Sequence, residues 1–110
     1  MVFIIFEGEI LMEFLIDKVG GIGEYDSEDT ASGMTFLTPN GKVFCIVRPN
    51  TIEVRTDENL KKVLTKKYES VMQSRYFGRG GIEIVPSGQM SEDEIYDLVR
   101  LSYNLSVEDQ

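Results

Sequence analysis

The spacing of hydrophobic residues along this chain predicts three helices and about five strands. Apolar positions three and four residues apart predict helices over residues 9–19, from a cap at residues 56–57 to residue 72, and over residues 91–105. Short apolar or alternating runs predict strands over residues 34–38, 43–47, 52–55, 75–77 and 82–85. The order α-βββ-α-ββ-α is typical of an α+β two-layer sandwich, with helices packed on one face of an antiparallel sheet.

Turn and capping signals indicate how these elements are joined. Pro39-Asn40-Gly41-Lys42 and Arg48-Pro49-Asn50-Thr51 are tight-turn sequences, so the first three strands are expected to form a meander. Gly78-Arg79-Gly80-Gly81 predicts the tip of a separate hairpin. Ser91-Glu92-Asp93-Glu94 matches a capping box at the start of the last helix. Residues 20–33, which are rich in glycine and acidic side chains, are expected to form a loop.

A chain of 110 residues with 42% hydrophobic residues is expected to be one domain with a small core, ending in a frayed tail over residues 106–110. Residues 1–6 are apolar, but no basic region precedes them, and acidic residues soon interrupt the run, which excludes a signal peptide and a membrane span. The codons of Glu7-Gly8-Glu9 can form a purine-rich run that resembles a ribosome-binding site. One hypothesis is therefore a native start at Met12, with residues 1–11 as an extension; the alternative is Met1.

The residue types present exclude several classes of function. The chain has no histidine and one cysteine, which excludes histidine-dependent nucleophilic catalysis, histidine-ligated metal sites and an intrachain disulfide. No phosphate-binding P-loop sequence occurs. We therefore expect no catalytic residues, metal or cofactor, and a cytoplasmic location. Cys45 lies in an apolar run and is expected to be a buried, inert thiol.

The acidic loop offers a second interpretation as a calcium site. Asp26, Glu28 and Asp29 carry the oxygen ligands that calcium prefers, but their spacing does not match an EF-hand. The alternative is a solvated loop.

Charge is strongly segregated along the chain. Nine of the eleven basic residues lie between Lys42 and Arg79, so residues 42–79 have a net charge of +5 within a chain of net charge −8. The acidic whole disfavours nonspecific binding to nucleic acid or anionic membranes. The basic middle nevertheless predicts a local anion-binding surface.

Two groups of residues in this basic middle are candidate sites. The first is the lysines of the central predicted helix, for which the alternative is a solvated face: Lys61, Lys62, Lys66 and Lys67. The second surrounds the predicted hairpin tip and combines arginines with aromatic residues, which suits base stacking and phosphate contact: Arg55, Arg75, Tyr76, Phe77 and Arg79. The alternative is that an aromatic ring packs in the core while Arg55 and Arg75 pair with Glu53 and Glu83 across the sheet.

Several segments resemble the MmcQ/YjbR-like domains over about residues 33–105. They are Gly41-Lys42-Val43-Phe44, Thr51-Ile52-Glu53-Val54-Arg55, Tyr68-Glu69-Ser70-Val71 and Leu98-Val99-Arg100-Leu101-Ser102-Tyr103-Asn104-Leu105. The chain lacks the histidine and tryptophan usual in that family before the last helix. The front half also resembles the TfoX N-terminal domain, and the predicted layers resemble the TATA-box-binding-protein fold. These resemblances imply a two-layer fold and a role in nucleic-acid binding.

The sequence thus predicts a small non-enzymatic binding domain that does not enter a membrane. If its partner is nucleic acid, the arginines and helix lysines are expected to contact phosphate. The alternative is a protein-interaction module that binds through an apolar patch of Leu37, Phe77 and Val85.

Overall fold

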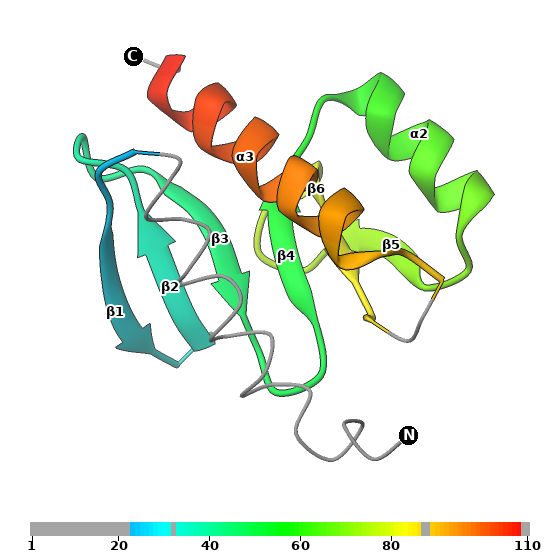
Figure 1. Cartoon of the computed structure of the whole chain (residues 1–110), viewed down its shortest axis with the longest axis horizontal. Coiled ribbons are helices and arrows are strands. Elements are labelled where there is room, and N and C mark those ends of the chain that lie inside the picture. Colours follow the sequence, from blue (N-terminus) through cyan, green and yellow to red (C-terminus); the bar gives the residue numbers. More distant parts are fainter. Residues whose placement is uncertain (1–22, 32, 87–88, 109–110) are drawn as a thin grey trace.

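A computed structural model describes residues 23–31, 33–86 and 89–108 of the chain, and these form an α+β fold. Six strands make one antiparallel sheet in the order β1-β2-β3-β4-β6-β5, and two helices, α2 and α3, pack on it (Figure 1). The fold class predicted from the sequence is therefore confirmed. The elements run as follows: β1 (Asp26–Thr30), β2 (Gly33–Leu37), β3 (Val43–Val47), β4 (Ile52–Arg55), α2 (Glu58–Lys67), β5 (Val71–Ser74), β6 (Gly78–Ile84) and α3 (Glu92–Glu108).

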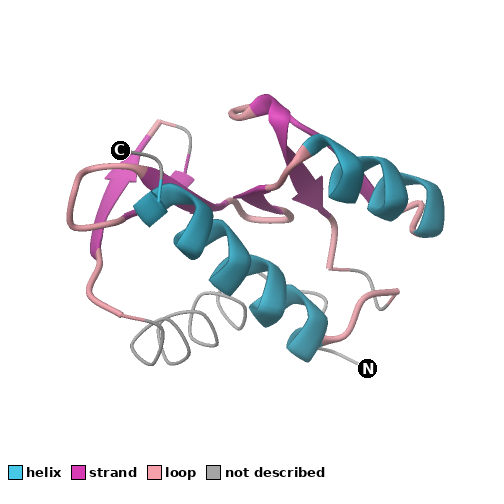
Figure 2. Ribbon diagram, turned by 90° about the horizontal axis from the view of Figure 1, so that it is seen from above, coloured by secondary structure: helices cyan, strands magenta, loops and turns pink. Residues whose placement is uncertain are grey.

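Both helices pack on one face of the sheet. α3 contacts β3 and β4, whereas α2 contacts β5 and β6, and Figure 2 shows α3 as a layer separate from the strands. Tyr68, which follows α2, donates a hydrogen bond from its hydroxyl to Glu94 of α3 over 2.6 Å, so the two helices are also joined to each other. The opposite face of the sheet, on which neither described helix packs, is called the helix-free face below.

The first strand was missed by the sequence prediction, which placed a loop over residues 20–33. β1 pairs with β2 from Asp26↔Leu37 to Thr30↔Gly33, and all five of its residues are exposed. An edge strand with water on both sides has no buried face, so it shows no hydrophobic alternation. Its carboxylates also discourage other strands from pairing with this edge.

The region between β4 and β6 differs from the prediction in two places. The central helix ends at Lys67 rather than residue 72, and Val71–Ser74 is strand β5. Residues 75–77, predicted as a strand, form a turn, and the glycine-rich segment predicted as a hairpin tip belongs to β6. Tyr68 and Val71 are both buried, and their three-residue spacing fits a helix as well as a chain that leaves the helix at Tyr68. The spacing therefore did not distinguish the two conformations.

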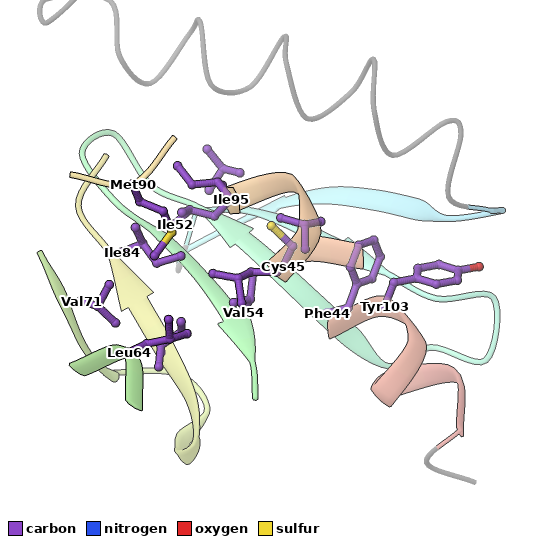
Figure 3. Packing of buried hydrophobic residues seen from close by; sticks show 14 of the residues in the cluster. Phe44, Cys45, Ile52, Val54, Leu64, Val71, Ile84, Met90, Ile95 and Tyr103 are labelled. Atoms are coloured by element: carbon purple, nitrogen blue, oxygen red, sulfur yellow. The ribbon is translucent and has the colours of Figure 1, made fainter. Parts of the chain in front are cut away.

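A β-bulge shapes the core beneath α3. Phe36 pairs with Cys45 and Leu37 pairs with Val43, so Phe44 is an extra residue in β3. As a result, the consecutive Phe44 and Cys45 both lie in the hydrophobic core (Figure 3). The Phe44 ring meets the Tyr103 ring edge to face, with centroids 5.0 Å apart. The predicted burial of Cys45 is confirmed, and this burial raises the pKa of its thiol.

α3 is tied to the sheet by its polar residues as well as by its apolar face. Ser102 accepts a hydrogen bond from the Arg55 backbone N–H over 2.8 Å and donates one to the Phe44 carbonyl over 2.5 Å, which bridges β3 and β4. Ser106, predicted to lie in a frayed tail, is buried, and the helix continues to Glu108 because this face still packs on β3. The predicted capping box is present, since Ser91 accepts from the Glu94 backbone N–H over 3.2 Å.

Three parts of the sequence prediction lie outside the described residues. They are the helix at residues 9–19, the possible extension at residues 1–11 and the end of the predicted tail at residues 109–110. In the described part of the chain, no helix is long and apolar enough to cross a membrane.

Candidate functional site

Two buried glutamates lie side by side on the helix-free face. Glu53 of β4 and Glu83 of β6 are Cα partners in adjacent strands, and both are almost fully buried. Their sequence neighbours on each strand, such as Val54 and Ile82, point into the core on the other face. The sequence shows this alternation, but it does not show that β4 pairs with β6, so the glutamate pair was not predicted.

Glu53 fastens the turn at residues 75–77 to the sheet. Its carboxylate accepts hydrogen bonds from the Ser74 hydroxyl over 2.5 Å and from the Tyr76 backbone N–H over 2.9 Å, and it forms an ion pair with Arg48. Ser74 in turn accepts from the Phe77 backbone N–H over 2.8 Å. A buried carboxylate needs such a full set of donors to remain charged at low cost. The turn therefore has one defined position over the sheet.

Glu83 is held by a second set of donors. The guanidinium of Arg75 donates to both of its carboxylate oxygens, over 3.0 Å and 2.6 Å, and the Thr51 hydroxyl donates over 2.7 Å. Burial tends to raise the pKa of Glu83, but the hydrogen bonds from Arg75 and Thr51 outweigh it and the pKa is lowered. The hydrogen bonds from Arg75 to Glu83, together with the negative charge of Glu83, raise the pKa of Arg75. Both groups are therefore charged at neutral pH.

Arg55 lies on the same face but has a different environment. Its Nε–H donates to the Val43 carbonyl over 2.8 Å, and its guanidinium lies over the Phe77 ring, 5.0 Å from the centroid. The Phe77 ring meets the Tyr76 ring edge to face at 5.0 Å. Among the described residues, no carboxylate forms an ion pair with Arg55. This surface therefore carries two arginines, Arg55 and Arg75, together with the aromatic rings of Phe77 and Tyr76.

Gly81 permits this close packing. It is the partner of Arg55 in the sheet, and a Cβ at this position would lie 2.7 Å from the Phe77 Cβ and 2.5 Å from the Val54 carbonyl oxygen. Any larger side chain would therefore push the turn away from the sheet.

The predicted site residues divide between the two faces of the sheet. Arg55, Arg75 and Tyr76 come together on the helix-free face, next to the glutamates. The lysines Lys61, Lys62, Lys66 and Lys67 belong to α2 and therefore to the helical layer. Figure 1 shows α2 and β5 at one end of the sheet and β1 at the other. The basic middle of the sequence therefore does not form one continuous surface.

The individual lysines and Arg79 are held in different ways. Lys61 lies 3.0 Å from a carboxylate oxygen of Glu58 and donates to the Gln73 side chain over 3.0 Å. Lys67 lies over the Tyr68 ring, and Lys62 and Lys66 are exposed. Arg79 has a side chain that is 88% exposed, and its nearest carboxylate oxygen, on Glu58, is 3.9 Å away.

The expected cross-strand ion pairs are present in part. Arg75 pairs with Glu83 as that alternative predicted, but Arg55 does not pair with Glu53. Arg48, which was not predicted as a site residue, takes that place. Its position in the turn between β3 and β4 directs it back over the sheet, and only the strand register shows this.

The exposed apolar residues differ from those expected. Leu37, Phe77 and Val85, predicted as an apolar patch, are each partly buried. The more exposed residues beside the glutamates are Met72, at 43% exposed, and Tyr76, at 49%. Met72 is the Cα partner of Glu83, to which Arg75 is bound. We call the resulting surface the turn patch, and it consists of Arg55, Met72, Arg75, Tyr76 and Phe77.

The predicted calcium alternative finds no support in the described residues. Asp26, Glu28 and Asp29 lie in strand β1 rather than in a loop. Within residues 23–31, 33–86 and 89–108, no three acidic or cysteine side chains are grouped so that they can hold a metal ion.

Comparison with known proteins shows a likeness of fold. The structure is similar to that of the Deinococcus radiodurans protein DR2400, a DUF419 domain protein, with a TM-score of 0.71 and 12% sequence identity over 86% of this chain and 79% of the other. It is also similar to a protein from Pseudomonas syringae, with a TM-score of 0.69 and 16% identity over 86% of this chain and 97% of the other. No family model matches the sequence, and no curated protein matches it. The fold of this chain is thus that of a DUF419 domain protein.

Proposed function

We propose that this chain is a small non-enzymatic binding domain and that it binds another protein through the turn patch. The observation that carries this proposal is the exposure of Met72 and Tyr76 beside Arg75 on a face that neither described helix covers. Tyrosine, phenylalanine, methionine and arginine are residue types enriched at protein interfaces, and tyrosine and arginine are also enriched among binding hot spots. The turn patch consists only of these types.

The rigidity of the turn favours a binding role. Glu53 and Ser74 hold the backbone of Tyr76 and Phe77 through hydrogen bonds, so the two rings are positioned before a partner arrives. A surface that is already ordered loses less conformational entropy on binding. The buried network therefore supports the exposed residues above it.

Nucleic acid is the weaker candidate for the partner. One feature favours nucleic acid: the Arg55 guanidinium lies over the Phe77 ring, which in turn contacts the Tyr76 ring. Arginine and aromatic faces suit base stacking. However, Arg48 and Arg75 are neutralised by buried glutamates, and the α2 lysines lie in the other layer.

Site-specific crosslinking tests the proposal. A photo-reactive phenylalanine analogue replaces Tyr76 in one variant and Val63 in a matched control, since Val63 is 58% exposed on α2. We expect a discrete protein adduct from position 76 in cells of the native host and none from position 63. Equal adducts from both positions, or nucleic-acid adducts from position 76, would reject a protein site at the turn patch.

The non-enzymatic part of the proposal rests on the state of the acidic groups. Glu53 and Glu83 are occupied by arginine, hydroxyl and backbone donors, so neither is free to accept a proton from a substrate. Cys45 is buried, and its raised pKa removes it as a nucleophile. A hydrolase screen with ester and phosphate substrates is expected to give no turnover that depends on Glu53 or Glu83.

We also propose that the chain is an MmcQ/YjbR-like protein of the cytoplasm. The fold likeness supports the first part, together with the segments around Gly41, Ile52 and Leu98 that resemble that family. Fractionation of the native host with an antibody to the protein tests the second part, and a membrane or secreted fraction would reject it.

A further inference from the structure

We propose that the partner of the turn patch is an acidic protein segment and that Arg55 binds one of its carboxylates. This inference rests on the proposed function and specifies the chemistry of the partner. It follows from Arg55, which forms no ion pair with a carboxylate of the described residues.

The guanidinium of Arg55 is oriented but not fully used. Its Nε–H is bonded to the Val43 carbonyl, and its plane is supported by the Phe77 ring. In the part of the chain that the structure describes, its terminal amino groups make no side-chain hydrogen bond or ion pair. Arginine donates through a rigid, planar fork that matches a carboxylate. Both terminal amino groups, with their four N–H donors, therefore remain for an incoming ligand.

The charge on this face is complementary to an acidic ligand. The strand register also puts the exposed Asp26 and Glu28 on this face, but they belong to β1, which is the edge strand farthest from the turn patch. Among the described residues that form ion pairs or ring contacts at the turn patch, Arg48, Arg55 and Arg75 lie with two carboxylates, Glu53 and Glu83. Both carboxylates are buried and paired, so they contribute little repulsion at the surface. The excess positive charge belongs to Arg55, and a partner carboxylate would neutralise it.

The neighbouring residues suggest how the rest of such a segment binds. Tyr76 and Met72 are exposed next to the arginines, and they offer apolar area for a side chain adjacent to the bound carboxylate. An acidic segment that contains apolar residues matches this arrangement better than a uniformly charged one. Nucleic acid would require several phosphate contacts along a basic track, whereas the exposed lysines lie on α2 in the other layer.

Binding of defined probes tests this inference. The probes are a fluorescent peptide of alternating glutamate and leucine, the same peptide with lysine in place of glutamate, and single-stranded oligo-dT. We expect the acidic peptide alone to bind, and Arg55→Met to weaken its binding about tenfold or more. Arg55→Lys should weaken it as well, because the charge remains but the fork is lost.

Arg100→Met is the matched control. Arg100 is an exposed arginine on α3 whose guanidinium also lies over an aromatic ring, 5.7 Å from the centroid of Tyr96. This variant removes the same charge, and we expect it to leave the affinity unchanged. An equal loss in both variants would mean that net charge, not a site, attracts the peptide, and it would overturn the inference.

The remaining outcomes are also decisive. If oligo-dT binds and loses affinity with Arg55→Met, the site takes nucleic acid and the inference is wrong. If no probe binds while crosslinking at position 76 still captures a protein, the proposed function stands and the acidic chemistry fails. If crosslinking also fails, the proposed function itself is rejected. Circular dichroism and a thermal melt of each variant confirm that the comparison is between folded proteins.

Discussion

The carboxylate of Glu53 accepts a hydrogen bond from the backbone N–H of Tyr76 over 2.9 Å, although the two residues are separated by a helix and a strand. The same carboxylate accepts from Ser74 and pairs with Arg48. One buried side chain thereby joins a central strand, the turn between β3 and β4, and the turn that carries the exposed aromatic rings. Its removal should affect both the stability of the domain and the order of the turn patch.

Glu53→Gln is expected to lower the free energy of unfolding by about 3 kcal/mol, because it leaves the buried partners of the carboxylate without a negative charge. Urea denaturation measures this change, and Glu69→Gln, at an exposed position, is the control with an expected change near zero. Backbone amide resonances of Tyr76 and Phe77 should shift in the first variant. A Glu53→Gln protein as stable as the wild type would show that the network does not hold the turn.

Ser102→Ala is expected to cost about 1–3 kcal/mol, because it leaves the Arg55 N–H and the Phe44 carbonyl without their partner. Ser106→Ala, one turn further along α3, removes only a long contact of 3.5 Å to the Val43 carbonyl and should cost less. The two midpoints of urea denaturation give the comparison. Equal losses would contradict a specific bridging role for Ser102.

Gly81→Ala is expected to destabilise the domain by about 1–3 kcal/mol, since the added methyl group would clash with the Phe77 Cβ and the Val54 carbonyl. Gly80→Ala makes the same change one residue earlier, where the nearest atom to the new Cβ is 3.6 Å away. Thermal unfolding of the pair separates the clash from the general effect of replacing a glycine. Similar melting temperatures would mean that Phe77 moves aside without cost.

Glu83 makes stability depend on acid pH. Its pKa is lower in the folded protein than the usual value of 4.5, so the unfolded state binds more protons as the pH falls. The stabilisation is fully present above the unfolded pKa, and it is lost as the pH falls below about 4.5 through the folded pKa. The difference in unfolding free energy between wild type and Glu83→Gln should therefore shrink across this range. A constant difference down to pH 3 would show that Glu83 does not titrate with folding.

The sequence predicted elements that have a buried face and local turns. Residues 43–47 and 52–55 form strands at the predicted positions, and the Ser91 capping box begins the last helix. β1 was not predicted, because an exposed edge strand of acidic residues has the composition of a loop. The first two residues of β5 were assigned to the preceding helix, because the buried Tyr68 and Val71 fit the helical spacing. Val71 is in fact buried as part of a strand.

The candidate site was predicted only in part. The pattern identified Arg55, Arg75 and Tyr76 as surface residues of interest, and the structure places them on one face. It did not identify Arg48, Glu53 and Glu83 as a network, because Glu53 and Glu83 are brought together by the pairing of β4 with β6 across an intervening helix and strand, and Arg48 reaches Glu53 through the turn between β3 and β4. The α2 lysines are separated from the arginines because the helix and the helix-free face of the sheet lie on opposite sides of the fold. The distribution of charge along the chain does not show this separation.

The strand order also has a consequence for how the domain folds. Strands β1 to β4 pair with their neighbours in sequence, and β5 pairs with β6, so each group can form from local contacts. Joining β4 to β6 closes a much longer loop, which makes it the slower step. Glu53 comes from the first group, and Tyr76 comes from the second. The turn patch therefore forms only after β4 has paired with β6. A partner that recognises it would bind the fully folded domain and would not bind a chain in which the two groups of strands are still separate.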